Sequence, residues 1–444
     1  MDGFAMLQRS EETDELLVDR LQKSAFTYFL RHTNRENGLV ADTSIGGSHC
    51  SIAAVGFALS SYPVAIERGW IDRTEAAEII LTTLNFFADS DQGEMRGATG
   101  HRGFYYHFID MKTGNRAWNS ELSMIDTALL FMGVLTIAEY FDRDEADDVE
   151  IRELSKFLYE RADWRWALNK GDTLAMGWKP GGGFLRWRYQ GYDEAILLYT
   201  MAMASPTHPI PPKCYDAFAS TYSWMMVKDK PFLYAGPLFI HLFSHAWIDF
   251  RGIRDKYMTE KDSDYFLNTQ IAIDAQRDYA DRNPGHFSGY GREVWGLTAC
   301  DGPNPTGSRH SRRGRQKVLG YAARGAPFGP DDGTIAPWAP LACLPFDRKA
   351  ALSGTRTMMA AYPAILLDGC FVGGFNPTVE GKGPEGWVDD RSVAIDQGLL
   401  VIMIENDRTG MIWKLLRGSP IIRKGLEKAG FKGGWLDGET AAVA

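Results

Sequence analysis

Three things are scarce in this sequence: paired cysteines, long apolar runs and basic blocks. Its five cysteines are scattered without a CxxC pair, so we expect neither a disulfide framework nor a structural zinc site. There is no run of about 18 apolar residues, and we therefore expect no transmembrane helix. The densest basic stretch, Arg309 to Lys317, is short and the net charge is −9, which argues against a nucleic-acid partner.

Several familiar motifs are missing as well. The chain has no GxSxG elbow, no GxGxxG after a strand and no phosphate-loop frame around the glycines at 181–183, so serine-hydrolase and nucleotide chemistry are unsupported. The N-terminal stretch MDGFAMLQRSEETDELL lacks the layout of a signal peptide. We expect a periplasmic or secreted protein if a signal peptide has been removed, and a cytoplasmic one otherwise.

Helical periodicity dominates what is present. Residues 13–33, for example, carry Leu17, Leu21 and Phe29 on one face after the N-cap candidate Thr13. Helices are expected at 13–33, 51–67, 73–89, 119–141, 147–162, 191–204, 212–227, 236–249, 262–281, 335–344, 347–362, 391–405, 408–416 and 418–429. Strand signals are confined to residues 103–111, 164–168 and 184–188.

This pattern predicts an all-α fold, an (α/α)6 toroid of six helical hairpins with a few short strands at one end. A single domain is expected over 15–435, between an N-terminal extension at 1–14 and a C-terminal tail at 436–444. An irregular α-rich domain is the alternative, and the lack of an internal repeat argues against a solenoid. The long connections are rich in Gly, Trp, Arg and Asp, and long structured loops commonly carry function.

Two aromatic loops end in carboxylates at the start of an apolar helix. Glu121 and Asp126 follow Trp118, and the pair Asp193 and Glu194 follows the loop WKPGGGFLRWRYQGY. Acids in a first helical turn often only complement the helix dipole, which is the structural alternative for Glu121 and for the 193–194 pair. Asp126 is harder to explain in that way, because a carboxylate on an apolar stretch needs a partner or a function.

A histidine cluster follows in the segment PLFIHLFSHAWIDFR. The HxxxH spacing places His241 and His245 on one helical face, with Asp249 a turn further. An HExxH motif is absent, so we favour the hydrogen-bonded lining of a polar groove over a metal site.

Acids also occur late in the chain. Asp301 lies near Trp295 at the head of the longest loop, and Asp396 and Glu405 lie on one largely apolar helix. On such a helix a carboxylate is more often a structural hydrogen-bond acceptor than a catalyst.

Paired carboxylates with aromatic platforms fit glycoside hydrolysis. One carboxylic acid protonates the leaving oxygen, and a second carboxylate activates water or attacks the anomeric carbon. Aromatic rings stack on sugar faces while charged groups bond the hydroxyls. A non-catalytic carbohydrate-binding protein would use the same loops, and a polysaccharide lyase could pair His241 with Tyr192; both remain as alternatives of another class.

An ordered set of segments resembles a known family. The segments are NSELSMIDTALLFMGVL, GYDEAILLY, LFIHLFSHAWIDFR, EVWGLTACDGP, DDGTIAPWAPLACLPF, GGFNPT and VAIDQGLLVIMIENDRTGMIWKLL. Together they resemble the bacterial glucoamylase-like domain family, which includes the endo-β-1,2-glucanases of glycoside hydrolase family 144. The family is related to cyclic β-1,2-glucan-processing domains, and the resemblance covers about residues 15–435.

The resemblance implies an (α/α)6 barrel, without metal or cofactor, that cleaves linear or cyclic β-1,2-glucan to short gluco-oligosaccharides. It implies Glu194 as the general acid and Glu121 as the second carboxylate, with Asp126 in reserve. Exo action, sophorose release or transglycosylation on β-glucans is the alternative, because the loop GPNPTGSRHSRRGRQKVLGY is longer and more basic than the family pattern.

Substrate contacts are expected from the loops around these acids. The candidates are His107, Trp178, Trp187, Arg188, Tyr192, Asp193, His241, Trp295, Asp301, Trp387, Asp396 and Gln397. The tryptophans at 118, 178, 187, 295, 338 and 387 are expected to gather at one mouth of the barrel as a sugar platform. The expected partner is a glucan oligo- or polysaccharide, and the protein is expected to be a monomer or a weak homo-oligomer.

Overall fold

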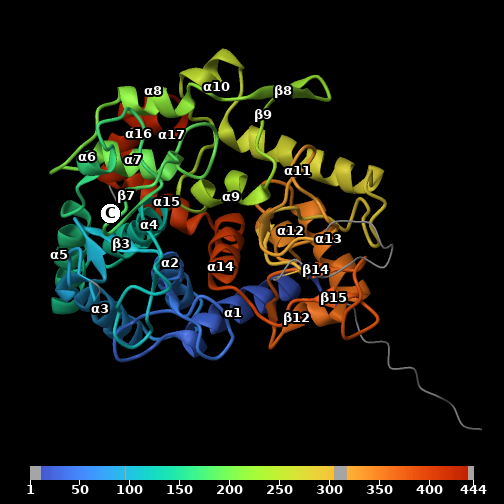
Figure 1. Ribbon diagram of the computed structural model, residues 1–444, viewed down its shortest axis with the longest axis horizontal. Helices are drawn as coiled ribbons and strands as arrows, with labels where there is room; N and C mark the ends of the chain where they lie inside the picture. Colours follow the sequence, from blue (N-terminus) through green and yellow to red (C-terminus); the bar gives the residue numbers. More distant parts are fainter. Residues whose placement is uncertain (1–11, 96, 305–317, 439–444) are drawn as a thin grey trace, which may run out of the picture.

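Six helical hairpins form a closed ring in the computed structural model, which describes residues 12–95, 97–304 and 318–438 (Figure 1). The outer and inner helices of the successive hairpins are α1 (Asp14–His32) and α2 (Ile52–Glu67), α3 (Arg73–Asp89) and α4 (Met124–Tyr140), α5 (Ala146–Glu160) and α7 (Ile196–Ala204), α8 (Lys213–Ala219) and α9 (Leu238–Trp247), α11 (Tyr265–Arg282) and α12 (Ala339–Ala342), and α13 (Arg348–Ala361) and α14 (Ala394–Arg408). The predicted all-α toroid is thus confirmed.

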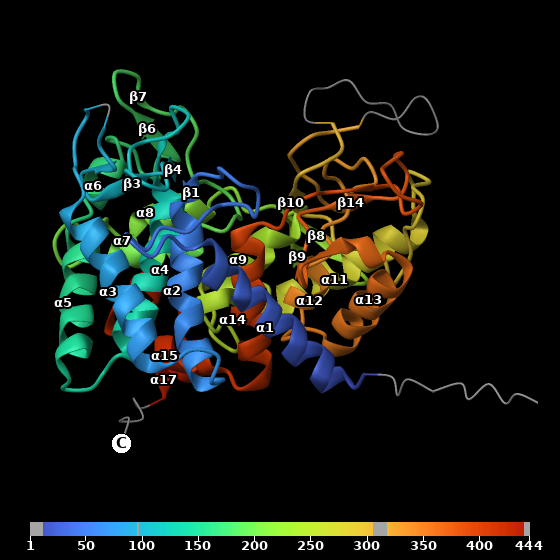
Figure 2. The ribbon, with the colours of Figure 1, turned by 90° about the horizontal axis from the view of Figure 1, so that it is seen from below.

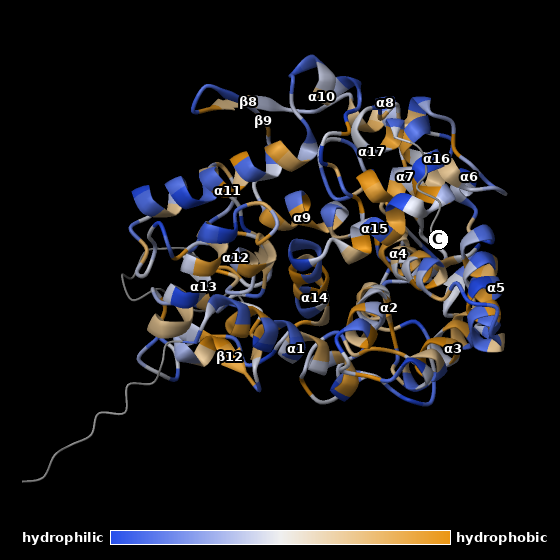
Figure 3. Cartoon of the chain, turned by 180° about the vertical axis from the view of Figure 1, so that it is seen from behind, coloured by the Kyte–Doolittle hydropathy of each residue, from blue (hydrophilic) through white to orange (hydrophobic). Residues whose placement is uncertain are grey.

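The inner helices are apolar on nearly all sides, whereas the outer ones are amphipathic. Every residue of α7 is buried, and so are residues 52–65 of α2. Helix α5 instead buries one stripe that includes Ile151 and Leu158, and it presents hydrophilic residues at the rim in Figure 3. In the described part of the chain, none of the helices is long and apolar enough to cross a membrane.

Two glycines allow the inner helices α2 and α4 to pack backbone to backbone. A Cβ atom added at Gly56 would lie 2.2 Å from the carbonyl oxygen of Leu129, and one at Gly133 would lie 2.2 Å from that of Gly56. Any larger residue would push the helices apart. Helix α14 packs on the other side of α2, which closes this part of the ring.

Most of the short strands labelled in Figure 2 lie above the helices, at one end of the ring. The largest sheet has the antiparallel order β2-β3-β5-β6-β7. Its strands are β2 (Gly100–His101), β3 (Phe104–Tyr106), β5 (Leu122–Ser123), β6 (Gly177–Lys179) and β7 (Gly183–Phe184). The two-stranded sheets are β1 (Cys50–Ser51) with β4 (Phe108–Ile109), β8 (Trp224–Val227) with β9 (Lys230–Leu233), β10 (Ala299–Cys300) with β11 (Ala322–Ala323), β12 (Leu366–Leu367) with β13 (Cys370–Phe371), and β14 (Phe375–Asn376) with β15 (Trp387–Val388).

Short helices complete the described chain. They are α6 (Trp164–Ala167), α10 (Lys256–Glu260), the 3-10 turn η1 (Pro363–Ile365), α15 (Met411–Gly418), α16 (Pro420–Lys428) and α17 (Gly434–Asp437). Helix α15 packs against α4 and α9, and α16 packs against α7. The C-terminal helices therefore support the inner ring from outside the six hairpins.

Two sequence predictions were wrong. Residues 164–168 were expected as a strand, but they form α6, because the Asp163 side chain accepts a hydrogen bond from the Trp166 N–H and starts a helix. The helix expected at 212–227 ends at Ala219. The chain then forms the β8–β9 hairpin, because Lys228 and Asp229 both adopt positive φ and make a tight turn that suits twisted strands.

Parts of the domain prediction lie outside the described residues. These are 1–11 of the N-terminal extension and 439–444 of the C-terminal tail. Most of the basic segment in the longest loop, 305–317, lies outside them too.

Candidate active site

A cavity of about 520 Å³ opens where the inner helices begin, and we call this end of the ring the mouth. All inner helices run from this end, so their first turns meet there. They contribute Ser51 and Ala53 (α2), Ile125, Asp126 and Leu129 (α4), Glu194 (α7), Phe239 and Phe243 (α9), Trp338 (α12), and Val393, Ile395 and Asp396 (α14). Loops add Asp42, Thr43, His107, Phe108, Ala299, Cys300, Asp301, Tyr321 and Gly373.

The lining is strongly acidic. Its carboxyl groups belong to Asp42, Asp126, Glu194, Asp301 and Asp396. Among the described residues that line this cavity, His107 is the sole basic side chain, and arginine and lysine are absent. Carboxyl groups gathered in this way without arginine or lysine beside them tend to hold protons more tightly, because burial and like charge both disfavour the ionised form.

Glu194 is placed at the start of α7 by its backbone. Its carbonyl oxygen accepts a hydrogen bond from Ser244 Oγ at 2.9 Å. Burial, together with the nearby Asp126 carboxylate, raises the pKa of Glu194 to about 7. A carboxylic acid that is still protonated near neutral pH can donate a proton to a leaving group.

The neighbouring Asp193 has a different place. Its Oδ1 accepts the Ala195 N–H at 2.9 Å, so it shapes the turn before α7. Burial, with the Glu194 charge adding to it, raises the pKa of Asp193 as well. Asp193 is not among the residues that line the cavity.

Asp126 and His107 face each other across the mouth. Asp126 Oδ2 accepts a 2.5 Å hydrogen bond from Ser123 Oγ, and it lies 3.6 Å from His107 Nε2. The Asp126 N–H in turn donates to Ser123 Oγ, so the N-cap of α4 holds this carboxylate in place. The contacts with Ser123 and His107 together fix the orientation of the Asp126 side chain.

Glu121 lies behind His107. Its Oε1 is 2.9 Å from His107 Nδ1, and this hydrogen bond lowers the pKa of Glu121 to about 2. The Glu121 side chain packs against Gly177 of β6, where an added Cβ would come within 2.8 Å of Glu121 Cγ. The structure thus places Glu121 against His107 and outside the cavity lining.

Two further acids of the lining are also perturbed. Burial, with the charges of Asp42 and Asp301 adding to it, raises the pKa of Asp396. Burial raises the pKa of Asp42 to about 6. The carbonyl of Asp42 accepts the Ala394 N–H at 2.8 Å, which ties its loop to the start of α14 and brings the two acids together.

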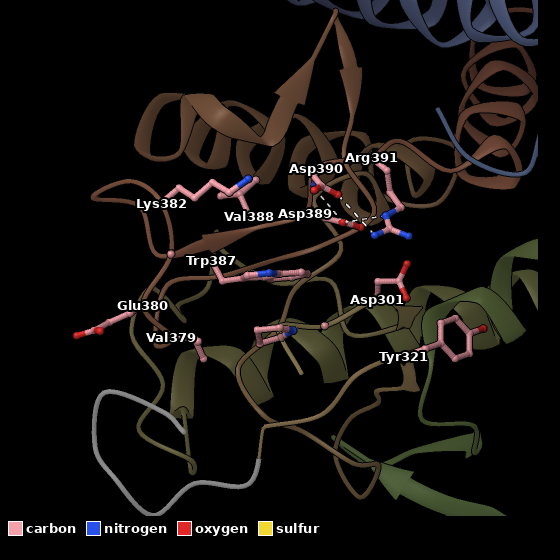
Figure 4. Close-up of a pocket in the computed structure, with 13 residues that line it drawn as sticks. Asp301, Tyr321, Val379, Glu380, Lys382, Trp387, Val388, Asp389, Asp390 and Arg391 are labelled. Carbon is pink, nitrogen blue, oxygen red and sulfur yellow. Dashed lines mark hydrogen bonds and ion pairs between the residues drawn. The ribbon is translucent and has the colours of Figure 1, made fainter. Parts of the chain in front are cut away.

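A second cavity, of about 710 Å³, continues from the first, because Asp301 and Tyr321 line both. Figure 4 shows Trp387 along its middle and Arg391 beside Asp389 and Asp390. Arg391 lies 3.3 Å from Asp389 and 3.5 Å from Asp390. The two cavities together form one acidic site with aromatic side chains, the arrangement expected of a sugar-binding cleft.

Comparison with known protein families identifies the chain. The sequence model of the Glycoamylase family, described as "Putative glucoamylase", matches residues 186–420. The chain belongs to this family. The matched range is more than half of the 444 residues, and it includes Glu194, Asp301 and Asp396 of the mouth. The resemblance inferred from the ordered segments is confirmed.

Individual relatives agree with the family and the fold. The chain is 27% identical, over 94% of its length, to an exo β-1,2-glucooligosaccharide sophorohydrolase (non-reducing end) of Parabacteroides distasonis, and it spans 58% of that protein. A "putative glucoamylase" structure from Bacteroides uniformis is 28% identical, with a TM-score of 0.83, and the match covers 96% and 99% of the two chains. An endo-β-1,2-glucanase structure from Chitinophaga pinensis shares the fold at 24% identity, with a TM-score of 0.83 and coverage of 96% and 100%.

The cavities of this Glycoamylase chain contain six of the residues that the sequence predicted as catalytic residues or substrate contacts. Asp126, Glu194, His107 and Asp396 line the first cavity, Trp387 lines the second, and Asp301 lines both. The fold brings together residues from positions 107 to 396, because each follows or precedes an inner helix.

Other predicted substrate contacts lie in the interior, outside both cavities. Trp295 is 1% exposed, and Trp178 is buried with its ring stacked on His101. Gln397 is fully buried and donates to the carbonyl of Phe371. Their assignment as sugar contacts stays a prediction that burial does not favour.

Arg188 and Trp187 lie on the loop that returns to α7. Arg188 donates to the carbonyl of Leu168 at 3.1 Å and so fastens this loop to the segment after α6. Trp187 is 59% exposed, and the Arg186 guanidinium lies over its ring. Neither side chain lines a cavity.

The expected platform of six tryptophans needs correction. All six belong to the described part of the chain, yet of these six only Trp338 and Trp387 line either of the two cavities of the cleft. Neighbouring glycines and charged residues in the sequence did not distinguish indoles that fill the core from indoles that face the cleft. Large apolar side chains are buried wherever the packing has room for them.

The histidine cluster is buried behind the site. His241 Nε2 bonds to the carbonyl of Ala235 at 3.0 Å, and its Nδ1 lies 3.3 Å from the hydroxyl of Tyr192. His245 Nε2 lies 3.3 Å from the Tyr265 carbonyl. These are structural hydrogen bonds, and in the described residues no group of three or more His, Cys, Asp or Glu side chains could hold a metal ion.

The residues of the cleft that were missed in the sequence include Asp42, Tyr321 and Asp389. Asp42 lies in a loop without aromatic neighbours, and Tyr321 is 73% exposed beside the segment that is not described. Their place just before an inner helix, or in a long loop, was the signal that could have found them. Burial, opposed by Arg391, raises the pKa of Asp389 to about 7.

Proposed function

We propose that this protein is a glycoside hydrolase that cleaves β-1,2-glucan. The observation that carries the proposal is the acidic mouth, where the protonated Glu194 and the Asp126 carboxylate line one cavity. Glycoside hydrolysis needs one carboxylic acid and one carboxylate in the same site.

Glu194 takes the role of general acid. It donates its proton to the glycosidic oxygen as the bond to the anomeric carbon breaks, and the leaving sugar departs as an alcohol. If Asp126 attacks the anomeric carbon, the Glu194 carboxylate takes its proton from the water that then releases the sugar from Asp126; if Asp126 activates water, Asp126 takes that proton, and the two carboxyl groups return to their starting forms by exchange with solvent. Its position among other acids favours the protonated starting form.

Asp126 takes the role of the second carboxylate, in place of Glu121. Asp126 lines the cavity, where Ser123 and His107 hold its side chain in place. Glu121 is occupied by His107 and lies outside the lining. Asp126 then activates water or attacks the anomeric carbon directly.

The relatives support the choice of substrate. The curated relative in Parabacteroides distasonis acts on β-1,2-glucooligosaccharides, and the Chitinophaga pinensis structure is that of an endo-β-1,2-glucanase. The chain spans 58% of the length of the curated relative, so the activity, substrate and partners of the whole protein belong to this proposal.

Product sizing with a panel of glucans tests the function. The purified protein is incubated with linear β-1,2-glucan, cyclic β-1,2-glucan, laminarin, starch and cellulose, and early products are separated by size. We expect short gluco-oligosaccharides from the β-1,2 substrates alone. Sophorose as the sole early product indicates exo action, whereas a mixture of lengths indicates endo action.

The same incubations separate the other classes of protein. Binding of the β-1,2-glucans without product release would identify a carbohydrate-binding protein. Products with the ultraviolet absorbance of an unsaturated sugar would identify a lyase. Cleavage of starch or laminarin in preference to the β-1,2-glucans would contradict the proposed linkage.

A further inference from the structure

We propose that His107, clamped by Glu121, is a positioning residue that keeps Asp126 ionised and in register with Glu194. The inference rests on the proposed function, since it explains how two carboxyl groups in one cavity keep opposite protonation states. It also gives Glu121 a task that differs from the catalytic one expected from the sequence.

The backbone around His107 is fixed on both sides. The chain at His107 joins β3 to β4, its N–H donates to the Glu121 carbonyl at 2.9 Å, and its own carbonyl accepts the Ile52 N–H at 3.2 Å. The ring stacks on Phe108, with centroids 4.0 Å apart and planes 18° apart. The imidazole is therefore held where α2, α4 and the five-stranded sheet meet.

The two ring nitrogens have different partners. Nδ1 lies 2.9 Å from Glu121 Oε1, which fixes the ring orientation and its Nδ1 proton. This leaves Nε2 directed at Asp126 Oδ2, 3.6 Å away. A carboxylate behind an imidazole that faces the reacting group raises the basicity of the ring and orients it.

The charges around His107 all have one sign. Asp126 faces it from α4, Glu121 from the position just before β5, and Asp42 from the loop before α2. Burial by itself would lower the pKa of His107, but these three carboxylates outweigh it and raise the pKa to about 9. At neutral pH the ring is then the one cation among the described side chains of the lining.

A cation at this place has a specific consequence for the two catalytic carboxyl groups. An opposite charge within about 4–6 Å favours the ionised form of a carboxyl group by 1–3 pKa units. His107 lies within this distance of Asp126, whereas no such contact is present for Glu194 in the described residues. Glu194 instead feels the negative charge of Asp126, which helps it to keep its proton.

The variant His107→Gln tests the proposal, because glutamine keeps a hydrogen-bonding group but loses the charge. On linear β-1,2-glucan we expect kcat to fall at least about 10-fold while KM changes less than about 3-fold. The acid limb of the kcat profile, where activity falls as pH is lowered, should move up by about one pH unit. Glu121→Gln should shift the limb in the same direction by less, because His107 remains beside Asp126.

His101→Gln is the matched control. His101 lies on the neighbouring strand β2, and its ring stacks on Trp178 rather than facing a carboxylate. We expect the acid limb of kcat for the His101→Gln variant to coincide with that of the unsubstituted protein. Near-ultraviolet circular dichroism and the melting temperature of all three variants check that the fold is kept.

Two results would overturn the inference. A rise of KM with an unmoved acid limb in His107→Gln would show that His107 contacts the sugar instead. A His107→Gln variant with full kcat at every pH would show that Asp126 needs no cation beside it.

A measurement without substrate separates this inference from the proposed function. The ring signals of 13C-labelled histidine, with His107 assigned from His107→Gln, are followed against pH by NMR. We expect a midpoint near 9, falling toward about 6.5 in both Asp126→Asn and Glu121→Gln. A midpoint that neither substitution moves would contradict the clamp, whereas failure to cleave β-1,2-glucan would contradict only the proposed function.

Discussion

The two ends of the helical ring both carry buried carboxylates, but they differ in whether arginine side chains lie beside these carboxylates. At the mouth, Glu194 and Asp396 line a cavity in which the described side chains include no arginine or lysine. At the opposite end, which we call the base, Glu405 forms a bidentate pair with Arg68 at 2.9 Å. Asp249 at the base is held by Arg251 and Arg417, and Asp407 by Arg348.

The contrast is sharpest within a single helix. Asp396 and Glu405 lie at opposite ends of α14, and both are nearly buried. Glu405 also accepts hydrogen bonds from Gln22 and Thr409, so its charge is fully compensated. Buried carboxylates with arginine partners are structural, whereas carboxylates with raised pKa in a cavity are typical of functional sites.

Removal of the acid at the mouth should have the largest effect. We expect Glu194→Gln to lower kcat on β-1,2-glucan about 10³-fold, because general acid catalysis is lost while the shape of the side chain is kept. The melting temperature should not fall, since Glu194 is uncharged in the native state near neutral pH. Initial rates and thermal unfolding measure the two quantities, and a loss of less than tenfold would remove Glu194 as the acid.

The two acids of α14 should respond in opposite ways. Asp396→Asn is expected to lower kcat/KM about 10- to 100-fold, as for a lost hydrogen bond to a charged group, with little change in stability. Glu405→Gln is expected to lower the free energy of unfolding by about 3 kcal/mol, because it leaves Arg68 without its partner. The activity of the folded Glu405→Gln protein should be unchanged.

Denaturant unfolding and steady-state kinetics on both proteins test this pair. Glu405→Asp is a milder control that keeps the charge beside Arg68 and should lose less stability. The distinction between functional acids at the mouth and structural acids at the base would be contradicted if Asp396→Asn mainly unfolded the protein or if Glu405→Gln mainly inactivated it.

The pH dependence of kcat/KM and of stability should report the protonation of Glu194 at the mouth. Catalysis needs protonated Glu194, so kcat/KM is expected to fall about tenfold per pH unit above about pH 7. Between pH 4.5, the ordinary pKa of a glutamate, and about 7 the native protein binds this proton and the unfolded chain does not. Stability should therefore fall as pH rises through this window. The Glu194→Gln protein should lack this contribution, and an alkaline limb well below pH 6 would contradict the assignment.

The smallest effect is expected for the aromatic residues of the cleft. Trp387→Ala should raise KM about 2- to 10-fold, the change expected for one lost stacking contact, because Trp387 lines the second cavity. Trp187→Ala tests whether Trp187 contacts the sugar, as the sequence predicted. A rise in KM equal to that of Trp387→Ala would support the predicted platform. An unchanged KM is expected from its position outside both cavities. Kinetics on glucans of defined length measure both.

Much of the fold could be predicted because helices leave a local pattern. The apolar run of α4 and the N-cap Thr13 of α1 are visible in the sequence, and the structure has both helices within a few residues of the predicted bounds. The β8–β9 hairpin was missed because its turn residues, Lys228 and Asp229, are not the Asn-Gly type that marks such turns. The short helix α6 was missed because its alternating tryptophans mimic a strand.

The site was predictable only in part. Glu194 and Asp126 could be singled out because each stands where an aromatic loop meets an apolar helix. Asp42 carries no such mark, and it joins the site because its loop is hydrogen-bonded to the start of α14. Glu121 carries the same mark as Asp126, yet it faces His107 rather than the cavity.

The sequence by itself determined the helical hairpins, the family and several of the acids from which the site is built, Glu194 and Asp126 among them. Those properties depend on periodicity and on the order of segments, which are local. Only the tertiary structure decided which acids remain without a cation, because the partners come from distant parts of the chain: Arg68 reaches Glu405 across 337 positions. A charge acquires its chemical role from the groups packed around it, and that packing exists only once the ring has closed.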